Sequence, residues 1–272
     1  MEWCGLTVSQ STVHAPGARI HVRVAGAGAD AVLLPSLGRA SEDFARLASD
    51  LVAAGFRVVL PEPRGIPPSL ALARPATLHD LAADVAAVIR ATCSPLVSVL
   101  GHAFGNRVAR TLASDHPSLV RALVLLACGG IVPIAPDVQR SLGACFALAL
   151  PEEERLAHVA RAFFADARNA VLWRDGWYPE VAAFQGAATR ATPVGEWWLG
   201  GEKDVLILQP ACDAVAPAEN ARLLAEPLGA RARIVEIAGA GHAALPEQPE
   251  AIARAVVGFL GWHQVAPPEP SE

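Results

Sequence analysis

The stretch of residues 97–110 constrains what this chain can fold into more than any other. It begins with a short apolar run, continues with a turn bracketed by Gly101 and Gly105, and ends with apolar residues at helical spacing. Glycines on both sides let the backbone pass close to its neighbours and hold the side chain at the tip in a strained position. The stretch therefore predicts a buried strand, a sharp turn with Ala103 at its tip, and a helix that ends near Asp115.

Apolar runs typical of strands alternate with helical patterns on both sides of this turn. Strands are expected over residues 19–25, 31–34, 56–60, 96–100, 122–127, 205–209 and 232–237, and further helices over residues 42–54, 78–90, 218–228 and 246–262. Several of the strand-like runs are continuously apolar, which is typical of strands covered on both faces. The order predicts an α/β fold with a mostly parallel central sheet and helices on both faces.

A helical insertion interrupts this alternation at residues 131–200, with its clearest helical pattern over residues 152–168. The chain is thus expected to consist of a core, formed by residues 1–130 and 201–265, and a helical cap over residues 131–200. Residues 266–272 form a tail rich in proline and glutamate, which we expect to be disordered.

Aromatic residues are concentrated in this expected cap, which contains nine of the fifteen in the chain. They either pack a small helical subdomain or form the apolar roof of a binding site, because aromatic side chains serve both purposes. On the second interpretation, we expect Trp173, Trp177 and Trp197 to contact a small, apolar substrate.

Charge and composition exclude several classes of function. The formal net charge is -5, Lys203 is the only lysine and the arginines are scattered, so a nucleic-acid partner is not expected. No signal-like start or apolar run long enough to cross a bilayer is found, so we expect a cytoplasmic protein without a membrane partner. The five cysteines and the remaining histidines lack the spacing of a metal site, so no metal and no cofactor are assigned. Composition does not predict the oligomeric state.

Three residues are expected at the same edge of the predicted sheet. Ala103, Asp213 and His242 each follow the carboxyl end of a predicted parallel strand, which is the edge where open α/β sheets bind ligands. Their order along the chain is tip residue, acid and histidine. The sequence therefore predicts that all three lie in one site.

With these motifs, the chain resembles the α/β-hydrolase superfamily over essentially its whole length. The resemblance is carried by residues 35–38 after the second expected strand, Arg64-Gly65, residues 101–105 at the elbow, the Asp213 loop, and Gly241-His242. It implies a nucleophile at position 103, His242 as general base and acid, and Asp213 as the group that orients the imidazole. It also implies an oxyanion hole made by the backbone N–H groups of Leu37 and Phe104.

The chain departs from the family pattern at three positions. Ala103 stands where the family has a serine, so the side chain at the tip has no nucleophilic atom. Pro35-Ser36 replaces the usual His-Gly, although the donors of an oxyanion hole are backbone groups and do not depend on this change. Cys128 stands at the position where some relatives carry the acid, which favours Asp213 as the acid of this chain.

Several of these residues have a second interpretation. His242 could be an ordinary loop histidine, and Asp213 could cap the helix that follows it. Ser36 is expected beside the substrate, either as a hydrogen-bonding turn residue or as a substitute nucleophile. Other candidates are His102, which is expected to orient the elbow, and Arg39 and Arg64, which either bind an anionic substrate or brace loops.

Three hypotheses of function follow. In the first, the protein is an enzyme acting on a small apolar ester, lactone or related carbonyl compound, and alanine at position 103 is a variant of a serine. In the second, Ala103 is native and the His242–Asp213 pair is a general base for non-covalent hydrolysis, elimination or cofactor-free chemistry. In the third, the pocket is a non-catalytic ligand-binding module.

Overall fold

A central sheet organises the computed structural model, which describes residues 1–94 and 96–265. The ten strands of the described residues follow the order β1-β2-β3-β5-β4-β7-β8-β9-β10, with β6 beside β3. Their bounds are Glu2–Trp3 (β1), Leu6–Ala15 (β2), Ala18–Ala25 (β3), Ala29–Leu34 (β4), Phe56–Pro61 (β5), Leu70–Ala71 (β6), Val97–His102 (β7), Val120–Leu126 (β8), Asp204–Pro210 (β9) and Ala232–Ile237 (β10). From β5 to β10 all neighbours are parallel, whereas β1 to β3 form an antiparallel edge.

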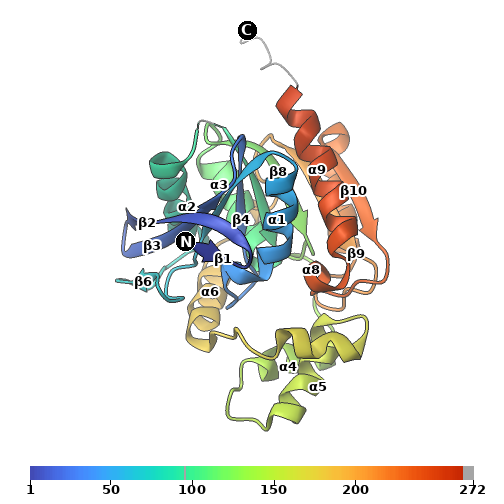
Figure 1. Ribbon diagram of the computed structural model, residues 1–272. Coiled ribbons are helices and arrows are strands. Elements are labelled where there is room, and N and C mark those ends of the chain that lie inside the picture. The colour runs from blue at the N-terminus through green and yellow to red at the C-terminus, as the bar shows by residue number, and fades with distance from the viewer. Residues whose placement is uncertain (95, 266–272) are drawn as a thin grey trace.

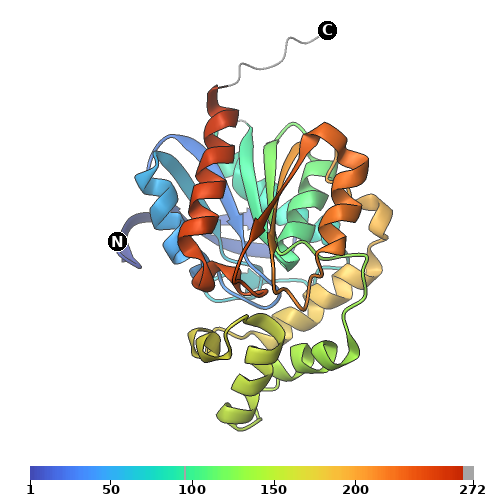
Figure 2. The same cartoon turned by 90° about the vertical axis from the view of Figure 1, so that its right-hand side faces the viewer.

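Helices cover both faces of this sheet, as Figures 1 and 2 show. One face is covered by α1 (Ala45–Ala53), α8 (Ala244–Glu247) and α9 (Pro249–Val265), and the other by α2 (Leu78–Thr92), α3 (Phe104–Asp115) and α7 (Glu219–Leu228). Short 3₁₀ turns are η1 (Ser41–Phe44) before α1 and η4 (Gly229–Arg231) after α7. The predicted α/β fold is confirmed.

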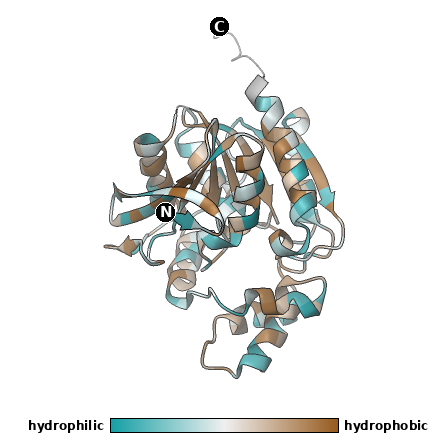
Figure 3. Cartoon of the chain, in the orientation of Figure 1, coloured by the Kyte–Doolittle hydropathy of each residue, from teal (hydrophilic) through white to brown (hydrophobic). Residues whose placement is uncertain are grey.

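The central strands are apolar on both sides because each side meets a layer of helices. In β8, Leu123 and Leu125 pack toward α2 and α3, whereas Val124 and Leu126 pack toward α1 and α9. Figure 3 shows the same separation, with hydrophobic strands inside and hydrophilic positions on the outer helices. The two cores hold the carboxyl ends of the parallel strands at one edge of the sheet.

The segment between β8 and β9 is helical. It contains α4 (Pro136–Cys145), α5 (Glu152–Phe163), α6 (Pro179–Ala191) and the 3₁₀ turns η2 (Ala167–Trp173) and η3 (Val194–Glu196). In Figure 1, α4 and α5 project beyond the sheet, whereas α6 runs back to the body of the molecule. Helix α5 ends at Phe163, before the end of the predicted helical pattern at residue 168. None of the helices in the described ranges has the length and apolar character needed to span a bilayer.

The disorder predicted for residues 266–272 lies outside the described residues. Strand β2, in contrast, is described and has no counterpart in the sequence analysis. Only Val8 and Val13 of this strand are buried, so most of its side chains face solvent and it lacks the apolar alternation that identifies a strand. It is positioned by antiparallel pairing with β3.

Candidate active site

The turn between β7 and α3 has a strained tip. Ala103 has φ +49° and ψ −106°, a backbone conformation that L-residues rarely adopt. A Cβ at Gly101 would lie 2.3 Å from the backbone nitrogen of Asn106, and one at Gly105 would lie 2.0 Å from the carbonyl oxygen of Leu34. Both glycines are therefore required by close packing of backbone on backbone, as the sequence pattern predicted.

Substituting Gly105 with alanine is expected to lower the free energy of unfolding by at least about 3 kcal/mol, because the new methyl group overlaps backbone that has no room to move. Gly143→Ala in α4 is the matched control, since no atom lies within 4 Å of the added Cβ. The control variant is expected to leave the free energy of unfolding unchanged or to raise it by about 0.5–1 kcal/mol. Chemical denaturation measures both, and equal stability of the two variants would contradict the steric explanation.

Two backbone N–H groups beside the tip have no acceptor among the described residues. They belong to Phe104, the first residue of α3, and Leu37, in the loop after β4. That loop is held from the insertion: the Gly38 N–H donates to Gln185 Oε1 (2.8 Å), and the Tyr178 N–H donates to the Gly38 carbonyl (3.0 Å). Unpaired N–H groups at a helix start favour negative charge. The arrangement is suited to stabilise an oxyanion.

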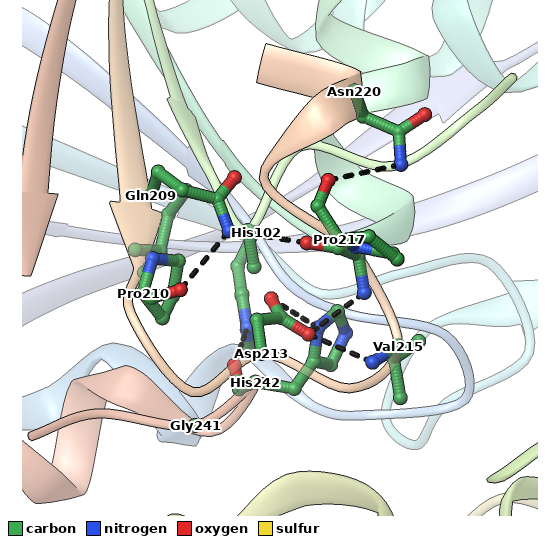
Figure 4. A network of polar contacts seen from close by, with 12 residues as sticks. His102, Gln209, Pro210, Asp213, Val215, Pro217, Asn220, Gly241 and His242 are labelled. Atoms are coloured by element: carbon green, nitrogen blue, oxygen red, sulfur yellow. Dashed lines mark hydrogen bonds and ion pairs between the residues drawn. The ribbon is translucent and has the colours of Figure 1, made fainter. Parts of the chain in front are cut away.

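Asp213 and His242 form a buried pair (Figure 4). His242 Nδ1 lies 2.9 Å from both carboxylate oxygens of Asp213, whose side chain is fully buried. Asp213 Oδ1 also accepts the N–H groups of Val215 (2.9 Å) and Ala216 (2.7 Å). Because the Nδ1–H is donated to the carboxylate, Nε2 is the basic nitrogen of His242. The imidazole also lines the cavity that contains Ala103.

A second layer of polar groups holds the loop of Asp213. Gln209 Nε2 donates to the carbonyls of Pro210 (3.0 Å) and Ala216 (3.1 Å), at the two ends of this loop. Asn220 Oδ1 accepts the N–H groups of residues 131 and 132, and thereby ties α7 to the chain that leaves β8. Cys128, between these segments, is fully buried, and burial raises the pKa of its thiol.

His102 holds the loop of His242 from the elbow. Its Nε2–H donates to the carbonyl oxygen of His242 at 2.8 Å. Burial, with a smaller contribution from the neighbouring His242, lowers the pKa of His102 to about 3. The ring is therefore neutral at ordinary pH, and it acts on the site by fixing backbone, which agrees with the orienting role expected from the sequence.

The depressed pKa of His102 makes stability depend on pH. Between pH 6.5 and pH 3 the unfolded chain binds a proton at this residue and the folded chain does not, so stability falls as the pH falls through this window. At pH 5 the loss from this group is about 2 kcal/mol relative to pH 7. His102→Gln keeps a donor and does not titrate, so it should show a smaller loss. Denaturation curves at both pH values measure the difference, and parallel losses would contradict this assignment.

The cavity at the sheet edge has a volume of about 1050 Å³, including the part open to solvent. Of the predicted substrate contacts, Ser36 and Trp177 line it, and so do Leu37 and Phe104, the residues expected to form the oxyanion hole. Besides Ala103, His242 and small residues, the lining includes Arg39, Arg107, Val132, Ile134, Gln139, Leu142, Phe146, Phe163, Thr189, Arg190 and Val215. The walls are thus apolar with several arginines, rather than apolar throughout.

Trp173 and Trp197 are not among the lining residues, which corrects two of the predicted contacts. Trp173 lies beneath the guanidinium of Arg39, 4.4 Å from ring centroid to Cζ, and its ring packs on His102. Trp197 is buried in the sheet core under Arg110, at 4.6 Å. Both rings are buried among other side chains and do not lie on the cavity wall.

Arg39 and Arg64 both brace loops. Arg39 donates to both oxygens of Asp43 and to the carbonyl of Asp175, so it links the core to the insertion. Arg64 donates to both oxygens of Asp84 and to the carbonyls of Pro16 and Ala73. Arg39 still contributes to the cavity wall, but its charge is paired.

Sequence reasoning did not identify Arg107 and Arg190 as cavity residues. Arg107 follows Ala103 by four positions, which places both on one face of the helix after the turn, so this signal was present. Arg190, at the end of α6, had no such signal because the insertion is positioned by tertiary contacts.

Known proteins share this fold. In sequence, 270 aligned residues are 26% identical to protein ABHD8 of Homo sapiens, covering 90% of this chain and 58% of that protein. A segment of 110 residues is 37% identical to RutD of Variovorax paradoxus, named as a candidate carbamate hydrolase, with 39% of this chain and 41% of RutD covered. The chain thus spans about two fifths to three fifths of the curated relatives it matches.

Solved structures match over more of their length. An esterase from Exiguobacterium antarcticum superposes with a TM-score of 0.80 at 20% identity, covering 93% of this chain and all of that one. A hydrolase from Pseudomonas aeruginosa gives 0.76 at 25% identity, with 94% and 98% covered. The model of the alpha/beta hydrolase family matches residues 31–255, a range that includes Ala103, Asp213 and His242. The chain belongs to the alpha/beta hydrolase family.

Proposed function

We propose that the cavity performs hydrolase-type chemistry on a small ester, lactone or related carbonyl compound, with His242 as general base. The observation that supports this most is the buried His242–Asp213 pair on the wall of a cavity that is also lined by Leu37 and Phe104, whose N–H groups have no acceptor among the described residues. A binding protein has no need of an oriented base beside oxyanion donors. These are parts that acyl transfer requires together.

Since Ala103 supplies no nucleophile, we propose that water attacks the substrate carbonyl directly. His242 Nε2 takes a proton from the water as its oxygen bonds to the carbonyl carbon, and the negative charge moves to the carbonyl oxygen. The N–H groups of Leu37 and Phe104 stabilise this oxyanion. When the intermediate collapses, the bond to the alcohol oxygen breaks, and the imidazolium returns the proton to the leaving alkoxide. Asp213 stabilises the imidazolium in between.

A covalent reaction through a serine at position 103 is the second candidate. The strained backbone of Ala103 supports it, because a conformation of this kind costs about 1–3 kcal/mol and here presents only a methyl group. Such strain has a use when the tip side chain reacts. On this interpretation the cavity is complete for covalent acyl transfer except for one hydroxyl group.

Turnover of an ester and lactone panel by the chain itself and by His242→Ala tests the proposal. We expect slow hydrolysis that His242→Ala abolishes, and no covalent adduct in intact-mass spectra taken during turnover. An adduct, mapped to Ser36 or another residue, would contradict the water mechanism. Absence of turnover over the whole panel, with ligand binding unaffected by His242→Ala, would instead support the binding-module hypothesis.

A further inference from the structure

The cavity carries positive charge that the described residues do not balance. Its lining includes three arginines, Arg39, Arg107 and Arg190, and no aspartate or glutamate. Arg39 is paired with Asp43 at 2.6 Å. Within the described ranges, no carboxylate forms an ion pair with Arg107 or Arg190. The carboxylate of Asp213, in the same site, is engaged by His242 and two N–H groups.

Arg107 and Arg110 lie one turn apart in α3, but they differ in their hydrogen-bond partners. Arg110 is buried and donates to the carbonyls of Asn106, Gly129 and Trp198, and to the amide oxygen of Asn106. Arg107 is half-buried and lines the cavity, yet no acceptor for its guanidinium exists in the part of the chain that the structure describes. Among the described residues its guanidinium stacks on the ring of Trp197, 5.5 Å from the centroid. Because the side chain is half-buried, its guanidinium is partly desolvated, and a ligand that supplies an acceptor would compensate for this.

The surroundings of Arg107 are also electropositive. Burial and the nearby Arg110 lower the pKa of Arg107 to about 10, so the guanidinium stays protonated at neutral pH. It lies in the first turns of α3, whose start carries unpaired N–H groups. Arg190 adds a second cation at an exposed position on α6. All of these features favour a negatively charged ligand in this part of the cavity.

We propose that Arg107 binds a carboxylate of the substrate, so that the substrate is an ester or lactone that also carries a free acid group. The planar fork of arginine matches a carboxylate and can donate two parallel hydrogen bonds to it. The apolar walls then hold the chain between this acid and the reacting carbonyl at Ala103. The assignment of that carbonyl rests on the proposed function, whereas binding of the acid group does not. It replaces the wholly apolar substrate expected from the sequence.

Binding to the chain itself tests this without requiring turnover. The probes are the monoethyl esters of succinate, glutarate and adipate, each compared with its neutral diethyl ester by titration calorimetry. At least one monoester is expected to bind on the order of ten- to a hundredfold more tightly than its diester, since a charge-assisted pair gains this much in a partly buried site. Arg107→Gln should remove the preference, and Arg107→Lys should retain part of it.

The matched control is Arg222→Gln on α7, which removes the same charge from an exposed side chain outside the cavity lining. It should leave the preference unchanged. Arg190→Gln should reduce it less than Arg107→Gln, because Arg190 is exposed and its interaction is screened by solvent. Melting temperatures of all variants verify that they fold. Equal affinities for monoester and diester, or a preference that survives in Arg107→Gln, would overturn the proposal.

The two proposals fail in different ways. Selective binding of monoesters without hydrolysis would preserve the carboxylate site and contradict the proposed reaction. Hydrolysis of neutral and acidic esters at equal kcat/KM would preserve the reaction and contradict the carboxylate site.

Discussion

Ala103→Ser is expected to raise ester or lactone hydrolysis by roughly a thousandfold or more over the chain with alanine. The elbow already holds this position at φ +49°, the His242–Asp213 pair is formed, and the N–H groups of Leu37 and Phe104 have no acceptor among the described residues. In the proposed site, the part that covalent acyl transfer still needs is a hydroxyl group at position 103. Removal of the serine from a complete triad costs on the order of 10⁶ in kcat, which sets the upper limit of the gain. Steady-state kcat/KM on the same substrate panel measures it.

The mechanism should change as well as the rate. With serine present, a burst of product and an acyl adduct on residue 103 are expected, whereas the alanine chain should show neither. Ala103→Cys is an informative companion, because a thiol placed beside His242 should form an adduct even if deacylation is slow. No gain in Ala103→Ser, with correct folding and an unchanged affinity for the monoester probes, would contradict the view that the site is a complete hydrolase site lacking only its nucleophile.

Asp213→Asn is expected to lower kcat/KM of the Ala103→Ser protein by about 10⁴-fold. The asparagine is isosteric and its oxygen can still accept the N–H groups of Val215 and Ala216, so the loop should keep its shape. The NH2 group that replaces Oδ2 cannot accept the Nδ1–H of His242, and the neutral amide cannot stabilise the imidazolium, so the ring loses an acceptor that fixes its tautomer and also loses its counter-charge. Activity against pH distinguishes this effect from misfolding, because part of the loss should be regained at alkaline pH.

Asn220→Ala serves as the control for loop disruption. Asn220 holds the same region through the N–H groups of residues 131 and 132, but it does not touch His242. It should lower stability by about 1–3 kcal/mol and leave the pH profile of the remaining activity unchanged. If Asp213→Asn behaved in the same way, the carboxylate would have only a structural role.

The parallel sheet and the edge that carries the site could be predicted from the sequence, because the patterns that indicate them lie within short stretches of the chain. Strand β7, the strained turn and α3 follow one another without a break, and the two glycines are required by contacts with residues five or fewer positions away or with the adjacent strand. The continuous apolar runs of β4, β8 and β9 reflect burial on both faces. Strand β2 was missed for the opposite reason, since it is an edge strand with two buried residues.

The residues that line the cavity could not be predicted from the sequence in the same way. Trp173, Trp177 and Trp197 have similar surroundings in the sequence, but only Trp177 reaches the cavity. Trp173 packs against Phe163 and Phe164 in the insertion, and Trp197 packs in the sheet core, so long-range packing decides where each ring lies. Which arginines are paired and which are not depends equally on long-range contacts, such as that between Arg64 and Asp84.

The sequence by itself determined the α/β fold, the elbow with Ala103 at its tip, and the order of tip, acid and histidine along the chain. These follow from local hydrophobic period, from steric need for glycine, and from the rule that parallel strands end at one edge. Only the tertiary structure decided that Asp213 and His242 are in contact and that Trp173 and Trp197 do not line the cavity. It also decided that Arg107 lines the cavity with no ion-pair partner among the described residues. Each of these depends on side chains that meet across the fold, and spacing along the chain gives only a partial signal, such as the four-residue separation of Ala103 and Arg107.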